Sequence, residues 1–191
     1  MTPTEFRQFT NSLYEALARD GFTPEDLDLR LQGSSARFFS GEHKSLDLDF
    51  QDNPEAQARV DSWFGDDAER PLRRPFDSMY RLGLDPEPSD YDLQISSDSM
   101  VDACRERWVA DGSPGNLFNS KYGFVVKEIF EDMFPGLWEW ADEWTARTGR
   151  PVVPALFPGS GPPDTSSIGK GVSSHFRDSD WPIQPDGSNS Q

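Results

Sequence analysis

Apolar side chains recur every three or four positions near the start of the chain, which is the period of an amphipathic helix. The stripe consists of Phe6, Phe9, Leu13 and Leu17. Thr2, Pro3 and Glu5 precede it in the order of a capping box with proline at the first helical position. Gly21 is a natural stop for such a helix. The pattern therefore predicts an N-terminal helix that ends near residue 20.

A different period follows, in which apolar and polar residues alternate. Leu27, Leu29 and Leu31 alternate with polar residues and lead directly into Gly33-Ser34-Ser35. This is the pattern of a half-buried strand that ends in a small-residue turn. Residues 76–84 and 91–96 also read as extended, and the "DPEPS" between them predicts a turn, so the two segments form a candidate hairpin. A last strand is expected in "RPVVPALFP", where Pro154 favours an edge position or a strand end.

Helical spacing returns in the second half of the chain. It predicts one helix from Ser97 to before Gly112 and two more within residues 119–147, separated at Pro135-Gly136. Residues 51–75 are polar, with one helix expected near residues 54–63, and read as an insertion. We therefore expect a single domain over residues 1–183, followed by a disordered tail at 184–191.

The charge of the chain limits its partners. The formal net charge is −16, and a negative far field opposes the approach of long nucleic acids. Small anionic ligands remain possible, because a nucleoside triphosphate carries Mg²⁺ and can be held by backbone N–H groups. The absence of a signal peptide pattern or long apolar run predicts a cytoplasmic protein with no membrane partner.

The supply of metal ligands is also limited. Cys104 is the only cysteine and is accompanied by two histidines, His43 and His175, so any metal site must rest on oxygen ligands. Cys104 lies on a helix face beside apolar neighbours and is most simply a buried hydrophobe. Three tryptophans at near-helical spacing are expected to pack in the core: Trp138, Trp140 and Trp144.

Two features carry candidate chemistry. Gly33 allows a backbone to approach phosphate oxygens, and Ser34 and Ser35 offer N–H groups and hydroxyls. Asp90 and Asp92 begin a predicted strand in "SDYDLQIS", where alternation places both carboxylates on one face. Paired carboxylates suit Mg²⁺ ions that act on a phosphoryl group.

The order of strand, Gly-Ser turn, variable segment and Asp-x-Asp resembles the nucleotidyltransferase superfamily related to DNA polymerase β, in its minimal form. The resemblance spans about residues 27–157 and rests on "LQGSSAR" and "SDYDLQI". It implies an α+β fold, with a small mixed β-sheet and helices packed mainly on one face. It also implies Mg²⁺-dependent transfer of a nucleoside monophosphate from an NTP to a hydroxyl of an unidentified small molecule or protein, through a two-ion site.

The resemblance assigns roles to residues of this chain. Gly33, Ser34 and Ser35 would bind the nucleotide, and Asp90 and Asp92 would bind the metals and carry catalysis. Two basic residues just after the turn, Arg37 and Lys44, are candidates to contact the triphosphate, although either also fits a solvated surface.

A second Asp-x-Asp pair, Asp47 and Asp49, is an alternative metal site. Twelve residues separate Ser34 from Asp47, which matches the usual family spacing. We favour Asp90 and Asp92, because they have the Ser-Asp-x-Asp-apolar form and a strand-like continuation, with a long insertion after the turn.

The third carboxylate of the family has no counterpart in "GRPVVPALFP". Asp98 or Asp164 could substitute for it. Its absence leaves a second reading open: a catalytically inactive nucleotidyltransferase-like domain that binds nucleotide or a protein partner. A third reading is an acidic interaction protein without a ligand.

Overall fold

The protein is built around a small mixed β-sheet. The computed structural model describes residues 1–40, 52–65, 71, 73–162 and 180–185. Four strands lie in the order β3-β2-β1-β4: β1 (Asp28–Leu31), β2 (Tyr91–Ser96), β3 (Val152–Phe157) and β4 (Trp181–Pro182). β1 is antiparallel to both β2 and β4, whereas β2 and β3 are parallel. The expected α+β class and mixed sheet are confirmed.

Helix α1 (Pro3–Arg19) begins with the predicted capping box. The backbone N–H of Glu5 donates to the Thr2 hydroxyl at 3.2 Å, and the Glu5 carboxylate accepts the Thr2 N–H at 2.7 Å. Two otherwise unsatisfied donors of the first turn are thereby paired, which stabilises the start of the helix.

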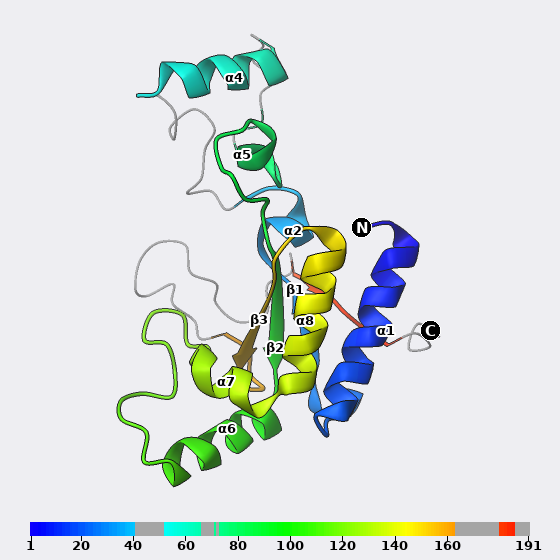
Figure 1. The fold of residues 1–191 in the computed structure, drawn as a ribbon, viewed down its shortest axis with the longest axis vertical. Helices are drawn as coiled ribbons and strands as arrows, with labels where there is room; N and C mark the ends of the chain where they lie inside the picture. Colours follow the sequence, from blue (N-terminus) through cyan, green and yellow to red (C-terminus); the bar gives the residue numbers. More distant parts are fainter. Residues whose placement is uncertain (41–51, 66–70, 72, 163–179, 186–191) are drawn as a thin grey trace.

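Helices α1 and α8 (Pro135–Thr148) pack together on one face of the sheet (Figure 1). Phe9 of α1 meets Trp140 of α8 edge to face, with ring centroids 4.7 Å apart. Trp140 and Trp144 are buried in this core, as the spacing predicted, and Trp138 packs against it partly buried. α8 begins at Pro135, and the Asp20 carboxylate accepts two N–H groups of its first turn.

One hydroxyl serves both buried indoles of this core. Ser12 Oγ accepts the Nε1–H of Trp140 and of Trp144, each at 2.9 Å. Ser12→Ala would leave two indole donors without this acceptor, so we expect the free energy of unfolding to fall by about 1–3 kcal/mol in urea denaturation. Ser160→Ala, which removes an exposed hydroxyl, serves as the control. Equal stability of the two variants would contradict the prediction.

The remaining helices lie around the ends of the sheet. They are the five-residue α2 (Gly33–Arg37), α4 (Pro54–Phe64), α5 (Ser78–Arg81), α6 (Asp98–Ala110), α7 (Lys127–Met133) and a 3₁₀ turn at Pro24–Asp26. Helices α4 and α5 extend beyond one end of the sheet (Figure 1), where Ala56, Val60 and Leu82 form a second, smaller cluster. None of the described helices combines the length and apolarity needed to cross a bilayer.

Helix α6 buries the single cysteine. Ser97, where the pattern predicted the helix to begin, caps it by accepting the N–H of Met100 at 3.3 Å. Cys104 is fully buried on the inner face, and burial raises the pKa of its thiol to about 12. The reading of Cys104 as a small core residue is confirmed.

The predicted hairpin between residues 76–84 and 91–96 is wrong. Residues 78–81 are helical, and β2 pairs with β1 and β3 instead. Met79, Leu82 and Leu84 pack against α4, so their apolar character reflects a helical contact rather than strand alternation.

The edge position of β3 in the described sheet agrees with Pro154. The N–H of Val152 donates to Thr145 Oγ1 and the carbonyl of Leu156 accepts from Val125, so these even-numbered residues face away from β2. Pro154 lies between them on the same side, where its missing N–H costs no ladder hydrogen bond.

Candidate functional site

The Gly-Ser turn lies directly against the second acid of the Asp-x-Asp pair. The N–H of Gln32 donates to the Asp92 carbonyl at 2.9 Å, which extends the β1–β2 ladder up to the turn. Gly33 has φ +67°, and a Cβ added there would lie 2.8 Å from Asp92 Oδ2. Only glycine fits this position without displacing the carboxylate.

The two acids flank a buried tyrosine at the start of β2. Tyr91 is 7% exposed, Asp92 is half-buried and Asp90 is exposed. Asp92 belongs to β2, whereas Asp90 lies one residue before the strand begins. Burial raises the pKa of the Tyr91 phenol, so this side chain stays uncharged between the two carboxylates.

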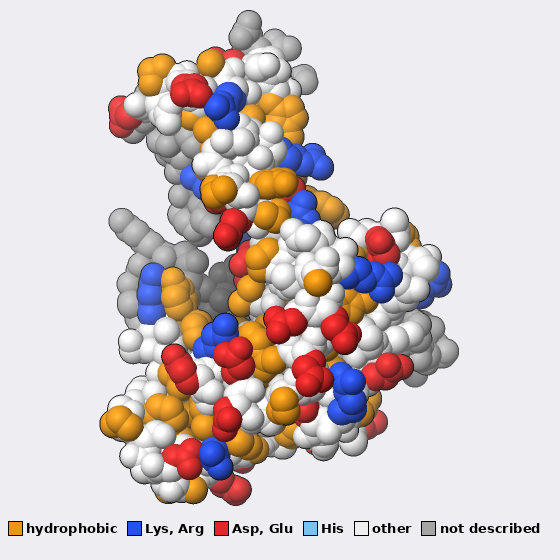
Figure 2. Space-filling model, in the orientation of Figure 1, with side chains coloured by type: hydrophobic (Ala, Val, Ile, Leu, Met, Phe, Trp, Pro, Cys, Tyr) orange, Lys and Arg blue, Asp and Glu red, His pale blue; other side chains and the backbone are white. Residues whose placement is uncertain are grey.

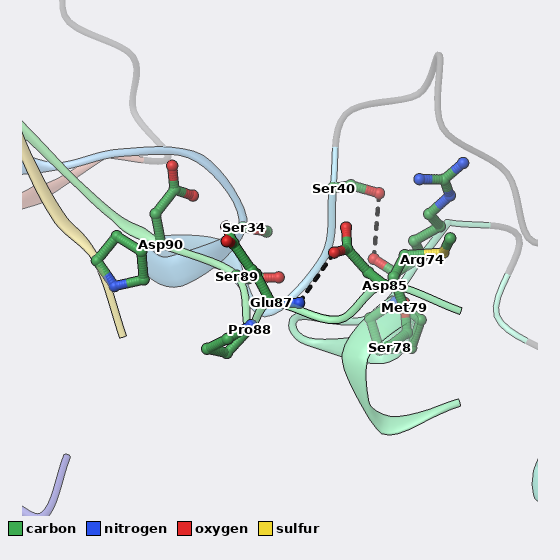
Figure 3. A pocket seen from close by; sticks show the side chains of 12 residues that line it. Ser34, Ser40, Arg74, Ser78, Met79, Asp85, Glu87, Pro88, Ser89 and Asp90 are labelled. Atoms are coloured by element: carbon green, nitrogen blue, oxygen red, sulfur yellow. Dashed lines mark hydrogen bonds between the residues drawn. The ribbon is translucent and has the colours of Figure 1, made fainter. Parts of the chain in front are cut away.

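A polar cavity of about 320 Å³ joins Ser34 to Asp90. Figure 3 shows these two residues on neighbouring segments at one side of the cavity, with Ser40 and Arg74 at the other. Within the part of the chain that the structure describes, the Asp90 carboxylate has no hydrogen bond or ion pair. It is therefore available to a ligand in this cavity.

Asp92 borders a second cavity of about 510 Å³. Phe124 and Trp138 contribute aromatic walls, and β3 forms one side. The two carboxylates thus adjoin two spaces of different character, one polar and one largely apolar.

The other predicted nucleotide-binding residues have different outcomes. Ser35 Oγ donates to the Gln32 carbonyl at 2.6 Å, so its hydroxyl is used inside the turn. Arg37 folds back, with Nε 3.5 Å from the Gly33 carbonyl oxygen. Lys44 and the alternative pair Asp47 and Asp49 lie outside the described residues.

Arg74 was missed by the sequence reasoning. It lines the polar cavity beside Ser40, whose hydroxyl donates to the Arg74 carbonyl at 3.1 Å. The signal that could have found it is the basic "RPLRRP" segment in an otherwise acidic chain.

Within the described residues, β3 offers no third carboxylate beside Asp92. Parallel pairing places Val153 of β3 beside Asp92, and Val153 is 40% exposed. Asp98 does not substitute, because it lies beyond the opposite end of β2 and accepts the Gly159 N–H at 2.8 Å. Asp164 lies outside the described residues, and within the described ones no group of three or more acidic, histidine or cysteine side chains could hold a metal.

Asp180, another acid that the sequence reasoning missed, lies across β1 from Asp92. β4 pairs Trp181 with Leu31, so the preceding Asp180 falls opposite Gln32, whose other neighbour is Asp92. Asp180 is 5% exposed. The hydrogen-bonded Asp28 carboxylate raises the pKa of Arg30, and the charge of Asp180 adds a smaller effect in the same direction.

Comparison of the chain with protein-family models, with curated proteins and with solved structures gave no match.

Proposed function

We propose that the protein is an Mg²⁺-dependent nucleotidyltransferase that moves a nucleoside monophosphate from an NTP to a hydroxyl acceptor. The observation that carries this proposal is the contact between Gly33 and Asp92. It brings together a turn suited to phosphate and a carboxylate suited to a metal, which lie 59 positions apart in sequence.

The proposed roles follow from position. The backbone at Gly33 and Ser34 would approach the triphosphate, with Arg74 across the cavity as a cation for phosphate oxygens. Arg37 and Lys44 remain weaker candidates for the same role. Asp90 and Asp92 supply the oxygen ligands that Mg²⁺ prefers, and together with substrate phosphates they suit one ion. Bound Mg²⁺ would activate the acceptor oxygen and neutralise the leaving pyrophosphate. A second ion would need further ligands.

The two cavities support a transfer reaction. Group transfer requires space for a donor and an acceptor on either side of the reacting phosphate. Asp90 adjoins the polar cavity and Asp92 the apolar one. The formal net charge of −16 favours a small acceptor or a protein over long nucleic acid, and Figure 2 shows acidic side chains interspersed with Lys and Arg on one face.

A catalytically inactive, nucleotide-binding form is the second candidate function. Val153 favours it, because this aliphatic side chain stands beside Asp92, where β3 would present a third carboxylate. Under this alternative, Gly33, Ser34, Asp90 and Asp92 bind Mg²⁺-NTP without turnover.

Double substitution of the favoured pair tests the proposal. Asp90→Ala/Asp92→Ala is expected to lower NTP-dependent pyrophosphate release or self-labelling by roughly 10³-fold or more, because the proposed metal ligands are removed. The measurement uses labelled NTPs and Mg²⁺.

Asp47→Ala/Asp49→Ala is the matched control and should retain activity. Loss in that variant alone would move the metal site to the earlier pair. Calorimetric NTP binding without turnover would favour the inactive form, and absence of both signals in the unmodified chain would refute both functions.

A further inference from the structure

The backbone that carries Asp90 is held on its N-terminal side by a buried ion pair. Arg150 donates to the two carboxylate oxygens of Asp77 at 2.7 and 2.5 Å. Asp77 also accepts the N–H of Ser89 at 3.1 Å, and Arg150 donates to the Ser89 carbonyl at 3.3 Å. Both backbone groups of the residue before Asp90 are therefore bound by the Asp77–Arg150 pair.

The C-terminal side of Asp90 is tied to the same elements. The Tyr91 N–H donates to the carbonyl of Pro151, the residue after Arg150, at 2.8 Å. Phe76 stacks near the Tyr91 ring with centroids 6.1 Å apart, and the Arg150 guanidinium lies 5.2 Å from the Phe76 centroid. Ser89 and Tyr91, the two chain neighbours of Asp90, are thus both hydrogen-bonded to groups at or next to Arg150.

Burial and paired hydrogen bonds restrict the Asp77–Arg150 ion pair to one geometry. The Asp77 side chain is 5% exposed, and the Arg150 side chain is 21% exposed. The planar guanidinium binds a carboxylate through two parallel hydrogen bonds, which fixes direction as well as distance. Asp77 has φ +68°, an uncommon conformation for a residue other than glycine. Such a conformation persists where surrounding contacts hold it.

The Asp90 side chain itself, by contrast, makes no hydrogen bond or ion pair among the described residues and lines the polar cavity (Figure 3). Because this carboxylate has no side-chain partner, its position depends on the backbone of Asp90. The hydrogen bonds to Ser89 and Tyr91 fix that backbone and leave the carboxylate open to a ligand.

We propose that Asp77 and Arg150 are positioning residues that fix the backbone of Asp90 and so present its carboxylate to a divalent cation. The role for the cation rests on the proposed function, whereas the fixing of the backbone does not. Partners that orient a metal ligand typically change metal affinity by roughly 10- to 100-fold when they are removed.

The test uses Asp77→Asn/Arg150→Met in the full chain. Asparagine tolerates the positive φ, and the double change leaves no unpaired charge inside the protein. The exposed ion pair on α6 provides the matched control, because Asp102→Asn/Arg105→Met removes the same charges from the protein surface. Arg150→Lys is a milder variant, which keeps the positive charge but not the planar fork.

Two measurements are made on each folded variant. NMR relaxation without metal reports the backbone order of Ser89, Asp90 and Tyr91, with Leu93 as an internal reference in mid-strand. Titration with Mn²⁺ alone, followed by electron paramagnetic resonance, reports cation affinity. We expect the double variant to lose order at residues 89–91 only and to bind Mn²⁺ at least about tenfold more weakly, with a smaller loss in Arg150→Lys. The α6 control should retain both properties.

The outcomes separate the two proposals. Unchanged backbone order at residues 89–91 in both Asp77–Arg150 variants would overturn the positioning role. The role would also be overturned if Asp90→Ala/Asp92→Ala abolishes Mn²⁺ binding but the Asp77–Arg150 variants lose backbone order and keep the same Mn²⁺ affinity. If the unmodified chain and Asp90→Ala/Asp92→Ala bind Mn²⁺ equally, the proposed metal site fails. The relaxation data would then still decide whether the pair fixes the backbone of Asp90.

Discussion

Gly33→Ala is expected to weaken binding of Mg²⁺-loaded NTP by roughly 10- to 100-fold while lowering the free energy of unfolding by only about 1 kcal/mol. The stability cost arises because alanine disfavours the positive φ of +67°. The larger binding loss arises because the new Cβ would lie 2.8 Å from Asp92 Oδ2 and force that carboxylate to move. Calorimetry with NTP and Mg²⁺, together with urea denaturation, measures the two effects.

Gly149→Ala is a closely matched control for this prediction. Gly149 has φ +66°, and a Cβ added there would meet no atom within 4 Å. The two variants should therefore lose similar stability, but only Gly33→Ala should lose binding. Equal NTP affinity in both variants would show that the contact with Asp92 has no part in the site.

The elements that the sequence predicted well are those specified by neighbouring residues. The capping box of Thr2 and Glu5 marks the start of α1, and Ser97 marks the start of α6. The alternation of Leu29 and Leu31 identifies β1. The two caps join residues three positions apart, and the alternation in β1 is itself a local period, so a local pattern contains the information.

The segment around α5 could not be predicted in this way. Its apolar residues Met79 and Leu82 pack against α4, a contact that no local period reveals. A strand and a short helix are equally compatible with a few apolar residues between turns. The helix forms because α4, more than ten positions earlier, supplies the surface that buries them.

The candidate site divides along the same line. The Gly-Ser turn and the Asp-x-Asp pair have recognisable local forms, and the structure places Gly33 against Asp92. The relation of Arg74 and Val153 to the site depends on contacts between distant parts of the chain. Arg74 lines the same cavity as Ser34 and Asp90, and Val153 pairs with Asp92 across two strands. The Asp77–Arg150 contact spans 73 positions, and no periodicity in the sequence indicates it.

Replacing Arg150 alone with methionine is expected to lower the free energy of unfolding by about 3 kcal/mol at pH 7, because it leaves the buried Asp77 carboxylate without its main partner. Arg81 gives only partial compensation, since its Nε lies 3.8 Å from Asp77 Oδ2 and its side chain is exposed. The hydrogen-bonded Arg150 guanidinium holds the pKa of Asp77 below its ordinary value. The exposed ion pair on α6 provides the comparison, because Arg105→Met should lower the free energy of unfolding by less than about 1 kcal/mol.

The loss in Arg150→Met should shrink as the pH falls, and the direction follows from the lowered pKa of Asp77. A carboxyl whose pKa is lowered by folding stabilises the protein above its unfolded pKa, about 3.9 for aspartate, and that contribution disappears as pH falls through the folded pKa. In the variant, burial without the guanidinium favours the protonated form, so acid relieves the unpaired charge. Urea denaturation of both proteins at intervals from about pH 7 to pH 3 should therefore give stability curves that converge below about pH 4. A constant difference over that range would mean that Arg150 stabilises the fold through packing on Phe76 rather than through the charge of Asp77.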